Sequence, residues 1–441
     1  MAALTAAPIA LSGCESKSSS SDRAGDDAAA TGDKPGSAGA DYRRRPALPT
    51  IEPMMRVCVF RARAQTPSIQ IGQADQWLRV FPLALSAGEI VLRGPLQVSV
   101  ASDRWLIVDD EGRRAPTESL DGLDIASLSD ATPSIKFNDR VYPGSLRIAA
   151  RTDQSAESFD VINLVPLEAY LPGVVAAELY DHWKLETRAA QAIAARSFAC
   201  SENALFRGRR AYDVTNTAMS QVYIGRVKHD DTLEAVQSTR GQVLAYDAAL
   251  VPGYYSSCCG GRAARAVDVI GDHPANDIVP LAGRAGQDVC TEVKVANWRI
   301  ERPVEALTRR LIAFGNVRRR DDLKGLATIA AIEISESNVH QRPLRFTVTD
   351  VHAHRVDISA EEFLRAANYQ GQGLAAPKER LMSSYLSAAV QDATVNFRGH
   401  GFGHGAGMCQ YGAEELARSG KDHREIVSWY YPQAEIVKAY S

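Results

Sequence analysis

The sequence predicts an α+β fold in which a β-rich N-terminal region precedes a core of mixed helices and strands, with a cleft between the two. Short apolar runs broken by Gly, Asp and Pro extend from Met55 to about Ile162, a pattern typical of strands. From Pro166 to about Asn203 the apolar spacing becomes helical and rich in Ala. Helices and strands do not alternate regularly after that, so a parallel doubly wound sheet is not expected.

The individual elements follow from the same patterns. The runs of strand composition in the first region are Arg56–Phe60, Trp77–Phe81, Glu89–Leu92, Gln97–Val100 and Trp105–Val108. Later runs of strand composition are Val243–Ser257, Ala327–Ile334 and Leu344–Val351. Short helices are predicted at Glu361–Ala367 and Ala413–Ser419, and Gly420 stands at the position that commonly ends a helix.

Length and composition limit the class of protein. The chain has 441 residues, of which 45% are hydrophobic, enough for one large core or for two domains of intermediate size. A net charge of -3 gives no reason to expect nucleic acid as a partner. No run of about 18 apolar residues is present, so no membrane-spanning helix is predicted.

The first residues have a composition of their own. Met1–Gly13 is apolar and small, and Leu11-Ser12-Gly13-Cys14 resembles a bacterial lipobox, in which Cys14 is lipidated. We therefore expect an exported protein anchored by lipid at the cell envelope, with a signal over 1–14 and a disordered linker over 15–50. No Lys or Arg precedes Cys14, so a cytosolic tail with an isolated Cys stays the alternative.

One carboxylate falls on an apolar helix face. That face is formed by residues at i, i+3, i+4, i+7 and i+8, namely Leu167, Tyr170, Leu171, Val174 and Val175. Glu178 follows at i+11 on the same face, whereas Glu168 falls off it. Apolar packing raises the pKa of a carboxyl group, as a general acid requires. The alternative is a Glu at a helix end that reaches solvent or pairs with Lys184 or Arg188.

The segment Phe397–Ala413 is rich in glycine, which alternates with polar and aromatic residues. Interior glycines disfavour a helix, and no Gly-Lys-Ser/Thr follows that would mark a phosphate-binding loop. His400 and His404 have the i, i+4 spacing of helical zinc ligands, but the glycines deny them a helix. We expect a loop with His400, His404 and Gln410 held outward; the alternative is a tightly packed strand whose histidines are satisfied internally.

Several blocks together resemble the SpoIID/LytB family, which comprises stage II sporulation protein D and the amidase enhancer LytB. The blocks are Asn163–Leu179, Leu185–Phe198, Ser220–Gly225, Val236–Tyr246, Tyr254–Gly261, Phe397–Ala413 and the tail Glu425–Pro432. They occur in the family's order. The expected boundaries are then a β-rich region over 51–160 and a SpoIID/LytB-like core over 161–441.

The resemblance implies action on peptidoglycan. Sporulation members are similar to lytic transglycosylases, which cut the glycan between N-acetylmuramic acid and N-acetylglucosamine and leave a 1,6-anhydro end. The family's catalytic glutamate maps onto Glu178, as single general acid and base, without a cofactor. The alternative from the other branch is a non-catalytic enhancer that binds peptidoglycan or an N-acetylmuramoyl-L-alanine amidase.

Candidate substrate-binding residues come from the helix polar positions, the resemblance and the glycine-rich segment. They are Gln191, Arg196, Gln221, Tyr223, Gly260, Gly261, His400, Phe402, His404 and Gln410. Some members hold a metal through Cys or His just before the Gln-x-Tyr segment, but Tyr212–Ser220 contains neither, so no metal is expected. The glycine-rich segment is predicted to share one cleft with Glu178.

The cysteines offer a further prediction. Apart from Cys14 they are Cys58, Cys200, Cys258, Cys259, Cys290 and Cys409. None forms a CxxC pair, which argues against a zinc ribbon or a thioredoxin motif. In an exported protein we expect a disulfide between Cys259 and Cys290, worth roughly 3 kcal/mol for a loop of about 30 residues. Cys258 is the competing partner of Cys290.

Overall fold

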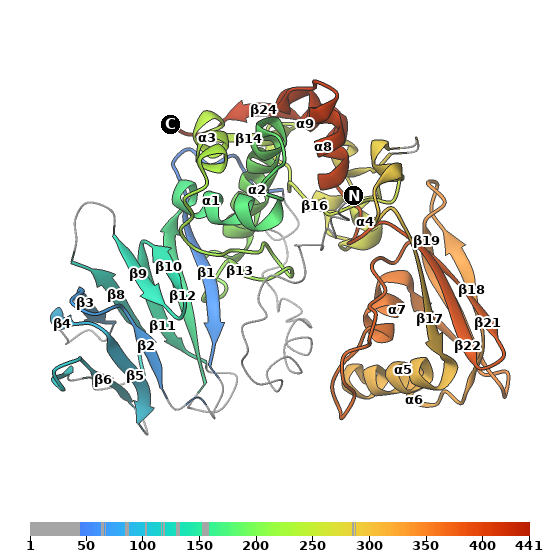
Figure 1. Ribbon diagram of the computed structural model, residues 1–441, viewed down its shortest axis with the longest axis horizontal. Coiled ribbons are helices and arrows are strands. Elements are labelled where there is room, and N and C mark those ends of the chain that lie inside the picture. Colours follow the sequence, from blue (N-terminus) through green and yellow to red (C-terminus); the bar gives the residue numbers. More distant parts are fainter. Residues whose placement is uncertain are drawn as a thin grey trace, which may run out of the picture. The chain divides into compact units, whose positions relative to one another are not determined.

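The computed structural model describes residues 45–441, apart from 63–65, 67, 84–87, 102–103, 116, 118–119, 129–132, 152–157, 285 and 287. The expected signal over 1–14 with Cys14, and most of the expected linker over 15–50, lie outside the described residues. The chain forms two compact units. The N-terminal unit comprises Pro46–Gly253 with Glu435–Ser441, and the C-terminal unit comprises Tyr254–Ala434 (Figure 1).

The N-terminal unit begins with strands and continues with helices. Its first strands are β1 (Met54–Arg61), β2 (Ile69–Ile71), β3 (Trp77–Pro82), β4 (Ile90–Arg93), β5 (Leu96–Ala101), β6 (Arg104–Val108), β7 (Arg114–Ala115), β8 (Leu123–Ser127), β9 (Ser134–Phe137), β10 (Arg140–Pro143), β11 (Ser145–Ala150) and β12 (Phe159–Pro166). Then come α1 (Leu167–Glu178), α2 (Leu185–Phe206), β13 (Val214–Thr215), α3 (Asp230–Ser238), β14 (Gln242–Tyr246), β15 (Ala249–Leu250) and, from the chain end, β24 (Glu435–Lys438).

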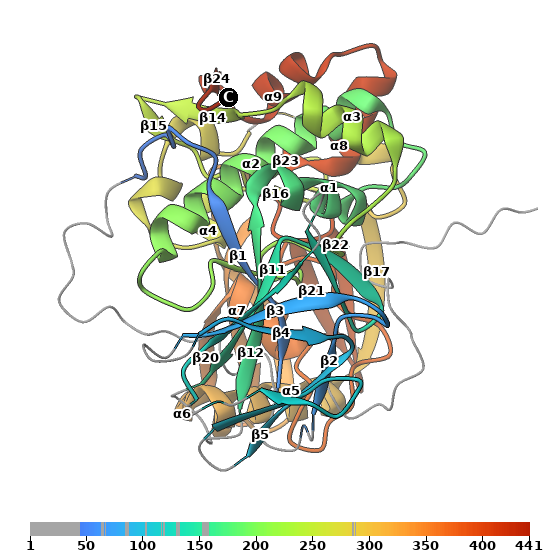
Figure 2. The same ribbon diagram turned by 90° about the vertical axis from the view of Figure 1, so that its left-hand side faces the viewer.

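These strands form three sheets; Figure 2 shows β3, β4, β2 and β5 of the two larger sheets below α1 and α2, and β14, β15 and β24 above them. The orders are β13-β1-β12-β11-β8-β3-β4, β10-β9-β2-β5-β6-β7 and β15-β14-β24. Alternate side chains of β1, β3 and β6 are buried, as expected of strands with one face on a core. The five strand runs predicted in this region all fall on observed strands.

The expected boundary between 160 and 161 differs from the observed division. It falls inside β12, which pairs antiparallel with β1 from Met54 opposite Pro166 to Arg61 opposite Asp160. β1 also pairs in parallel with β13, so Val57 lies opposite Val214. Because one sheet contains strands from both sides of residue 160, the unit continues to Gly253.

The C-terminal unit also mixes helices and strands. Its elements are β16 (Tyr255–Ser256), α4 (Ala266–Val269), β17 (Asn297–Pro303), α5 (Val304–Arg318), α6 (Asp321–Lys324), β18 (Ile329–Ser337), β19 (Pro343–Asp350), β20 (Arg355–Ser359), α7 (Ala360–Ala367), β21 (Leu386–Gln391), β22 (Thr394–His400), β23 (Met408–Cys409), α8 (Gln410–Arg418) and α9 (His423–Tyr430). Short 3₁₀ turns span Pro274–Asn276, Val279–Leu281 and Val289–Glu292.

Two three-stranded sheets and a parallel pair organise this unit. The sheets are β17-β22-β21 and β18-β19-β20, and the pair is β16 with β23. One apolar core includes Leu307 and Leu311 of α5, Phe346 of β19, Phe363 of α7 and Phe397 of β22. The expected mixed α and β architecture is therefore confirmed for the chain. No helix among the described residues is long and apolar enough to span a membrane.

A buried ion pair lies at the centre of the N-terminal helices. Arg196 of α2 is fully buried, and its Nε and Nη2 atoms each donate to the Glu168 carboxylate at 2.9 Å. The same guanidinium donates to the carbonyl oxygens of Val236 and Gln242. Burial disfavours the charge of Glu168, but the hydrogen bonds and positive charge of Arg196 outweigh it and lower the pKa of this carboxyl. The pair thus stabilises the unit while Glu168 is ionised.

We predict that Arg196→Met destabilises the protein by roughly 3–5 kcal/mol, because Glu168 would be left buried and unpaired. The folded protein lowers the pKa of Glu168 below its ordinary value of 4.5. The ion pair therefore stabilises the protein fully above pH 4.5, and this stabilisation is lost as the pH falls through the lowered pKa of the folded state. Urea unfolding at pH 7 and at progressively lower pH measures this difference. Equal stability of variant and wild type at pH 7 would contradict it.

A matched control is the pair of Arg240 with Glu52, 2.6 Å apart, whose side chains are 34% and 23% exposed. Arg240→Met is expected to cost at most about 1 kcal/mol, because a solvated ion pair gains little.

Candidate functional site

Helix α1 places Glu178 at the edge of an apolar core. Leu167, Tyr170, Leu171, Val174 and Val175 are all fully buried, as their spacing predicts. The helix passes through Pro172 without interruption and has Glu178 as its last residue. Glu178 is half-buried, so its carboxyl group lies where the apolar face meets the surface of the unit.

The segment 220–225 packs along α1 and holds this carboxyl group. The backbone N–H of Val222 donates to Glu178 Oε1 at 2.9 Å, and Ile224 N–H donates to the carbonyl of Gly173 at 3.3 Å. A Cβ atom on Gly173 would overlap the carbonyl oxygen of Gly225 and lie 2.7 Å from the Tyr223 ring. The missing side chain at residue 173 is therefore what lets the segment approach Glu178.

Buried hydrogen bonds also hold the segment 220–225 from its interior side. The Tyr170 hydroxyl donates to Gln221 Oε1 at 3.1 Å, and Gln221 Nε2 donates to the Ala195 carbonyl at 3.2 Å. The Tyr223 hydroxyl donates to Asn163 Oδ1 at 3.0 Å. The rings of Tyr170 and Tyr223 lie 4.7 Å apart between centroids. Gln221 and Tyr223 thereby anchor the backbone that carries Val222.

These contacts correct the expected role of four candidate residues. Gln191, Arg196, Gln221 and Tyr223 are each fully buried, which gives them no exposed surface for a substrate. Arg196 is committed to Glu168, and Gln221 and Tyr223 are committed to the contacts above. Their positions indicate that they hold α1, α2 and the segment 220–225 in place.

The loop after Glu178 carries aromatic residues that the sequence analysis did not select. Tyr180 lies 5.6 Å from His182 and 5.3 Å from Trp183 between ring centroids. Tyr180 is half-buried and His182 exposed. Arg188, the proposed ion-pair partner in the alternative, is fully buried and donates to the carbonyls of Tyr180 and Asp181. In the sequence, the signal that could have pointed to this loop is the group of aromatic residues shortly after Glu178.

The glycine-rich segment lies in the C-terminal unit, where it packs against the strand that begins this unit. Phe402 and Cys258 exchange backbone hydrogen bonds, and Tyr255 pairs with Met408. A Cβ atom on Gly407 would overlap the carbonyl oxygen of Tyr254, and one on Gly399 would overlap the Trp298 ring. Gly401, Gly403, Gly405 and Gly407 all have positive φ. Close packing therefore accounts for the glycines, and residues 401–407 form a loop between β22 and β23, as the first interpretation had it, not the strand of the alternative.

The histidines of this segment have internal partners. Ala406 N–H donates to His404 Nδ1 at 3.0 Å, and burial followed by the positive charge of Arg342 lowers the pKa of His404 to about 4. His400 Nδ1 donates to Asn297 Oδ1 at 2.8 Å, and burial lowers its pKa as well. Both imidazoles are neutral at pH 7. His400, Phe402 and His404 keep part of their surface exposed, whereas Gln410 is buried.

Gly260 and Gly261 lie beside the glycine-rich segment, since a Cβ atom on Gly260 would lie 2.7 Å from Gly401 N. Cys259 and Cys290 hold free thiols whose Sγ atoms are 3.5 Å apart, and their disulfide stays a prediction. The shared cleft also stays a prediction, because Glu178 belongs to the N-terminal unit and the glycine-rich segment to the C-terminal one.

Comparison with known protein families finds a match over the segment that contains Glu178. Residues 155–246 match the SpoIID family, described as stage II sporulation protein. They contain α1 with Glu178, α2 and the segment 220–225, and the resemblance to the SpoIID/LytB family is thereby confirmed.

Three related proteins are similar to this chain over longer stretches than the family match. The chain is 28% identical over 304 residues to an uncharacterized protein of Brachyspira hyodysenteriae, covering 68% of this chain and 73% of the relative. It is 26% identical over 334 residues to the stage II sporulation protein D of Bacillus amyloliquefaciens, covering 71% and 84%. It is 23% identical over 286 residues to the amidase enhancer of Bacillus subtilis, covering 59% of this chain but 39% of the enhancer.

We predict that Gly173→Ala disturbs the SpoIID segment where it meets Glu178. The added methyl group must displace the segment 220–225, so we expect a loss of roughly 1–3 kcal/mol and faster hydrogen exchange at the Val222 amide. Urea unfolding and amide exchange measure the two effects.

Gly88→Ala is the control, because a Cβ atom at Gly88 would meet nothing within 4 Å. Unchanged protection of the Val222 amide in Gly173→Ala would show that the contact does not hold the segment.

Proposed function

We propose that this protein acts on the peptidoglycan of the bacterial cell wall and cleaves its glycan strands as a lytic transglycosylase, with Glu178 as general acid and base. The observation that carries the proposal is the placement of Glu178: half-buried at the end of an apolar helix, held by Val222 N–H, and inside the SpoIID segment. The similarity to relatives named stage II sporulation protein D and amidase enhancer supports the cell-wall role.

In the first step Glu178, protonated on Oε2, gives its proton to the oxygen that joins N-acetylmuramic acid to N-acetylglucosamine. The bond from C1 of the muramic acid to this oxygen breaks, and the N-acetylglucosamine leaves with a free hydroxyl group. Glu178 is half-buried and follows the fully buried Val174 and Val175 on the same helix, and an apolar surrounding is what a carboxylic acid that donates a proton requires.

In the second step the carboxylate of Glu178 takes the proton of the muramic acid's own C6 hydroxyl, and O6 bonds to C1. The product carries a 1,6-anhydro ring, no water is consumed, and Glu178 returns to its protonated form. The Val222 N–H on Oε1 stabilises the carboxylate between the two steps. Because the nucleophile belongs to the substrate, orientation supplies much of the rate, and one carboxyl group suffices where most glycosidases use two.

The aromatic loop next to Glu178 fits a carbohydrate substrate. Tyr180 and His182 offer ring faces against which a sugar can stack. Arg188 holds the loop through the backbone carbonyls of Tyr180 and Asp181. The proposal places the protein outside the cytoplasm with Cys14 as its lipid anchor, because peptidoglycan lies there.

We predict that Glu178→Gln keeps the fold and lowers glycan cleavage by on the order of 10²–10⁴-fold, because proton transfer is lost. Purified protein is incubated with intact and with peptide-stripped sacculi, and mass spectrometry quantifies anhydromuramic ends. Glu234→Gln, an exposed carboxylate on α3 in the same unit, is the matched control and is expected to keep wild-type turnover. Wild-type turnover in Glu178→Gln would refute the assignment.

A second candidate function is supported by the amidase enhancer of Bacillus subtilis. In that case the protein would bind peptidoglycan or an N-acetylmuramoyl-L-alanine amidase and stimulate the amidase without cutting glycan. Sacculi treated with an amidase distinguish the two: enhancement that is equal for wild type and Glu178→Gln, without anhydro ends in either, favours the enhancer.

A further inference from the structure

Four ligand-type side chains converge in the interior of the C-terminal unit. They are Cys259, Asp288, Cys290 and Cys409, and their ligand atoms all lie within 4.8 Å of one another. All four residues are at most 3% exposed. They come from three segments that are far apart in sequence, namely the start of the unit, a 3₁₀ turn and the start of α8. Three sulfurs and a carboxylate oxygen form a donor set that suits Zn²⁺.

The spacing of the atoms fits a single tetrahedral ion. With zinc–sulfur bonds of about 2.3 Å, the sulfurs of a tetrahedral site are about 3.8 Å apart. The Sγ atoms of Cys259 and Cys290 are 3.5 Å apart, and Cys259 Sγ is 3.0 Å from Asp288 Oδ2. We propose that Cys259, Asp288, Cys290 and Cys409 bind one Zn²⁺ ion as a closed structural site.

Backbone amides surround the sulfurs as they do in thiolate sites. Gly261 N–H donates to Cys290 Sγ at 3.3 Å, and Cys259 N–H and Gly412 N–H each donate to Cys409 Sγ at 3.4 Å. Hydrogen bonds of this kind stabilise a charged ligand. They also fix the direction from which each sulfur faces the centre.

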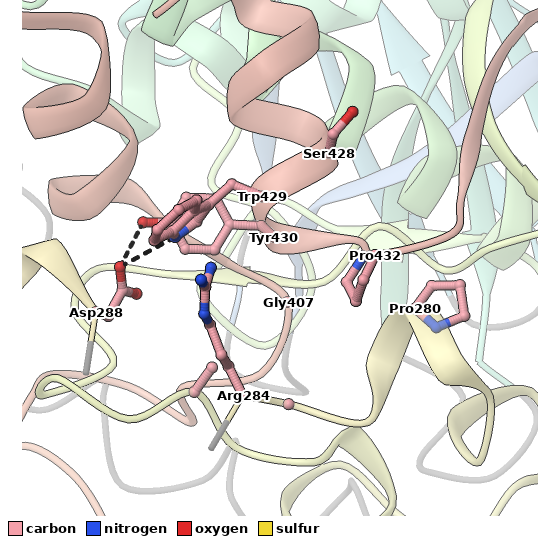
Figure 3. A pocket seen from close by; sticks show the side chains of 10 residues that line it. Pro280, Arg284, Asp288, Gly407, Ser428, Trp429, Tyr430 and Pro432 are labelled. Carbon is pink, nitrogen blue, oxygen red and sulfur yellow. Dashed lines mark hydrogen bonds between the residues drawn. The ribbon is translucent and has the colours of Figure 1, made fainter. Parts of the chain in front are cut away.

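Asp288 is oriented by its own set of donors. Its Oδ1 atom accepts from Val289 N–H at 2.7 Å, from the Tyr430 hydroxyl at 3.1 Å and from Trp429 Nε1 at 3.4 Å. Figure 3 shows Trp429 and Tyr430 of α9 both directed at this carboxylate. Oδ2 is thereby left to face the thiols. Such partners of a ligating carboxylate tune metal affinity.

The charges also call for a cation. Three thiolates and a carboxylate buried together would be strongly disfavoured without compensation. Zn²⁺ supplies two positive charges, and the buried guanidinium of Arg342, which donates to the Cys259 carbonyl at 2.9 Å, supplies a third. Binding releases to solvent the protons that the thiols still hold and changes no oxidation state. The ion then ties the glycine-rich segment, through Cys409, to the two other segments.

This inference differs from the disulfide between Cys259 and Cys290, which would join two of the four ligands and leave Cys409 and Asp288 outside the bond. It is independent of the proposed function, because its readouts are bound metal and metal affinity.

The test is the metal content of the full chain purified under reducing conditions without added chelator. We expect one zinc per chain by plasma mass spectrometry, and thiolate-to-cobalt charge-transfer absorption after exchange with Co²⁺. Cys409→Ser is expected to lose most of the zinc. Cys258→Ser is the matched control, since Cys258 is a buried neighbour outside the set of four, and is expected to keep it.

Tyr430→Phe keeps all four ligands and guards against a Cys409 variant that fails to fold. Loss of the hydroxyl donor to Asp288 is expected to weaken zinc affinity roughly 10–100-fold, as measured by competition with a chromophoric chelator. Reduced wild-type protein without zinc, or with a Cys259–Cys290 disulfide and no bound metal, would overturn the proposal. Equal zinc affinity of Tyr430→Phe and wild type would overturn the assignment of Asp288 as a ligand.

Discussion

The ion pair between Arg196 and Glu168 joins more of the N-terminal unit than any single apolar contact described above. Arg196 connects α2 to α1 through Glu168, to α3 through the Val236 carbonyl and to β14 through the Gln242 carbonyl. Glu168 in turn accepts from the Gly241 amide and from the Tyr440 hydroxyl near the chain end. A buried guanidinium has five donors in a fixed plane, so it sets the relative positions of these elements more strictly than methyl groups would.

The site around Glu178 depends on that arrangement and on close backbone approach. α1 can present Glu178 to the Val222 amide only because its apolar face is fixed in the core and Gly173 leaves room for the segment 220–225. Gln221 and Tyr223 hold this segment through hydrogen bonds to buried partners. The residues of this segment are thus divided between Glu178, whose side chain is partly exposed, and several buried residues that hold the backbone around it.

In the C-terminal unit, too, glycines allow two backbone segments to approach closely. The alternating glycines let the segment from Gly399 to Gly407 lie directly against Trp298 and Tyr254, where side chains would separate the two strands. That approach brings Cys409 to Cys259, and with them Asp288 and Cys290, into one buried cluster. The glycine-rich motif and the cysteine cluster are therefore two aspects of one packing arrangement.

The sequence by itself determined the local elements whose periodicity is strong: the strand runs of β1, β3 and β6, the apolar face of α1, and the position of Glu178 on it. These follow from residues within one or two turns of each other. It did not predict α3 or α5, although Leu307 and Leu311 of α5 belong to the apolar core of the C-terminal unit. Only the tertiary structure decided that Arg196, Gln221 and Tyr223 are internal supports, that the boundary between units follows Gly253, and that four residues spread from 259 to 409 share one centre. The physical reason is that burial, ion pairing and the clustering of possible metal ligands depend on contacts between segments far apart in the chain. No local pattern in the sequence contains that information.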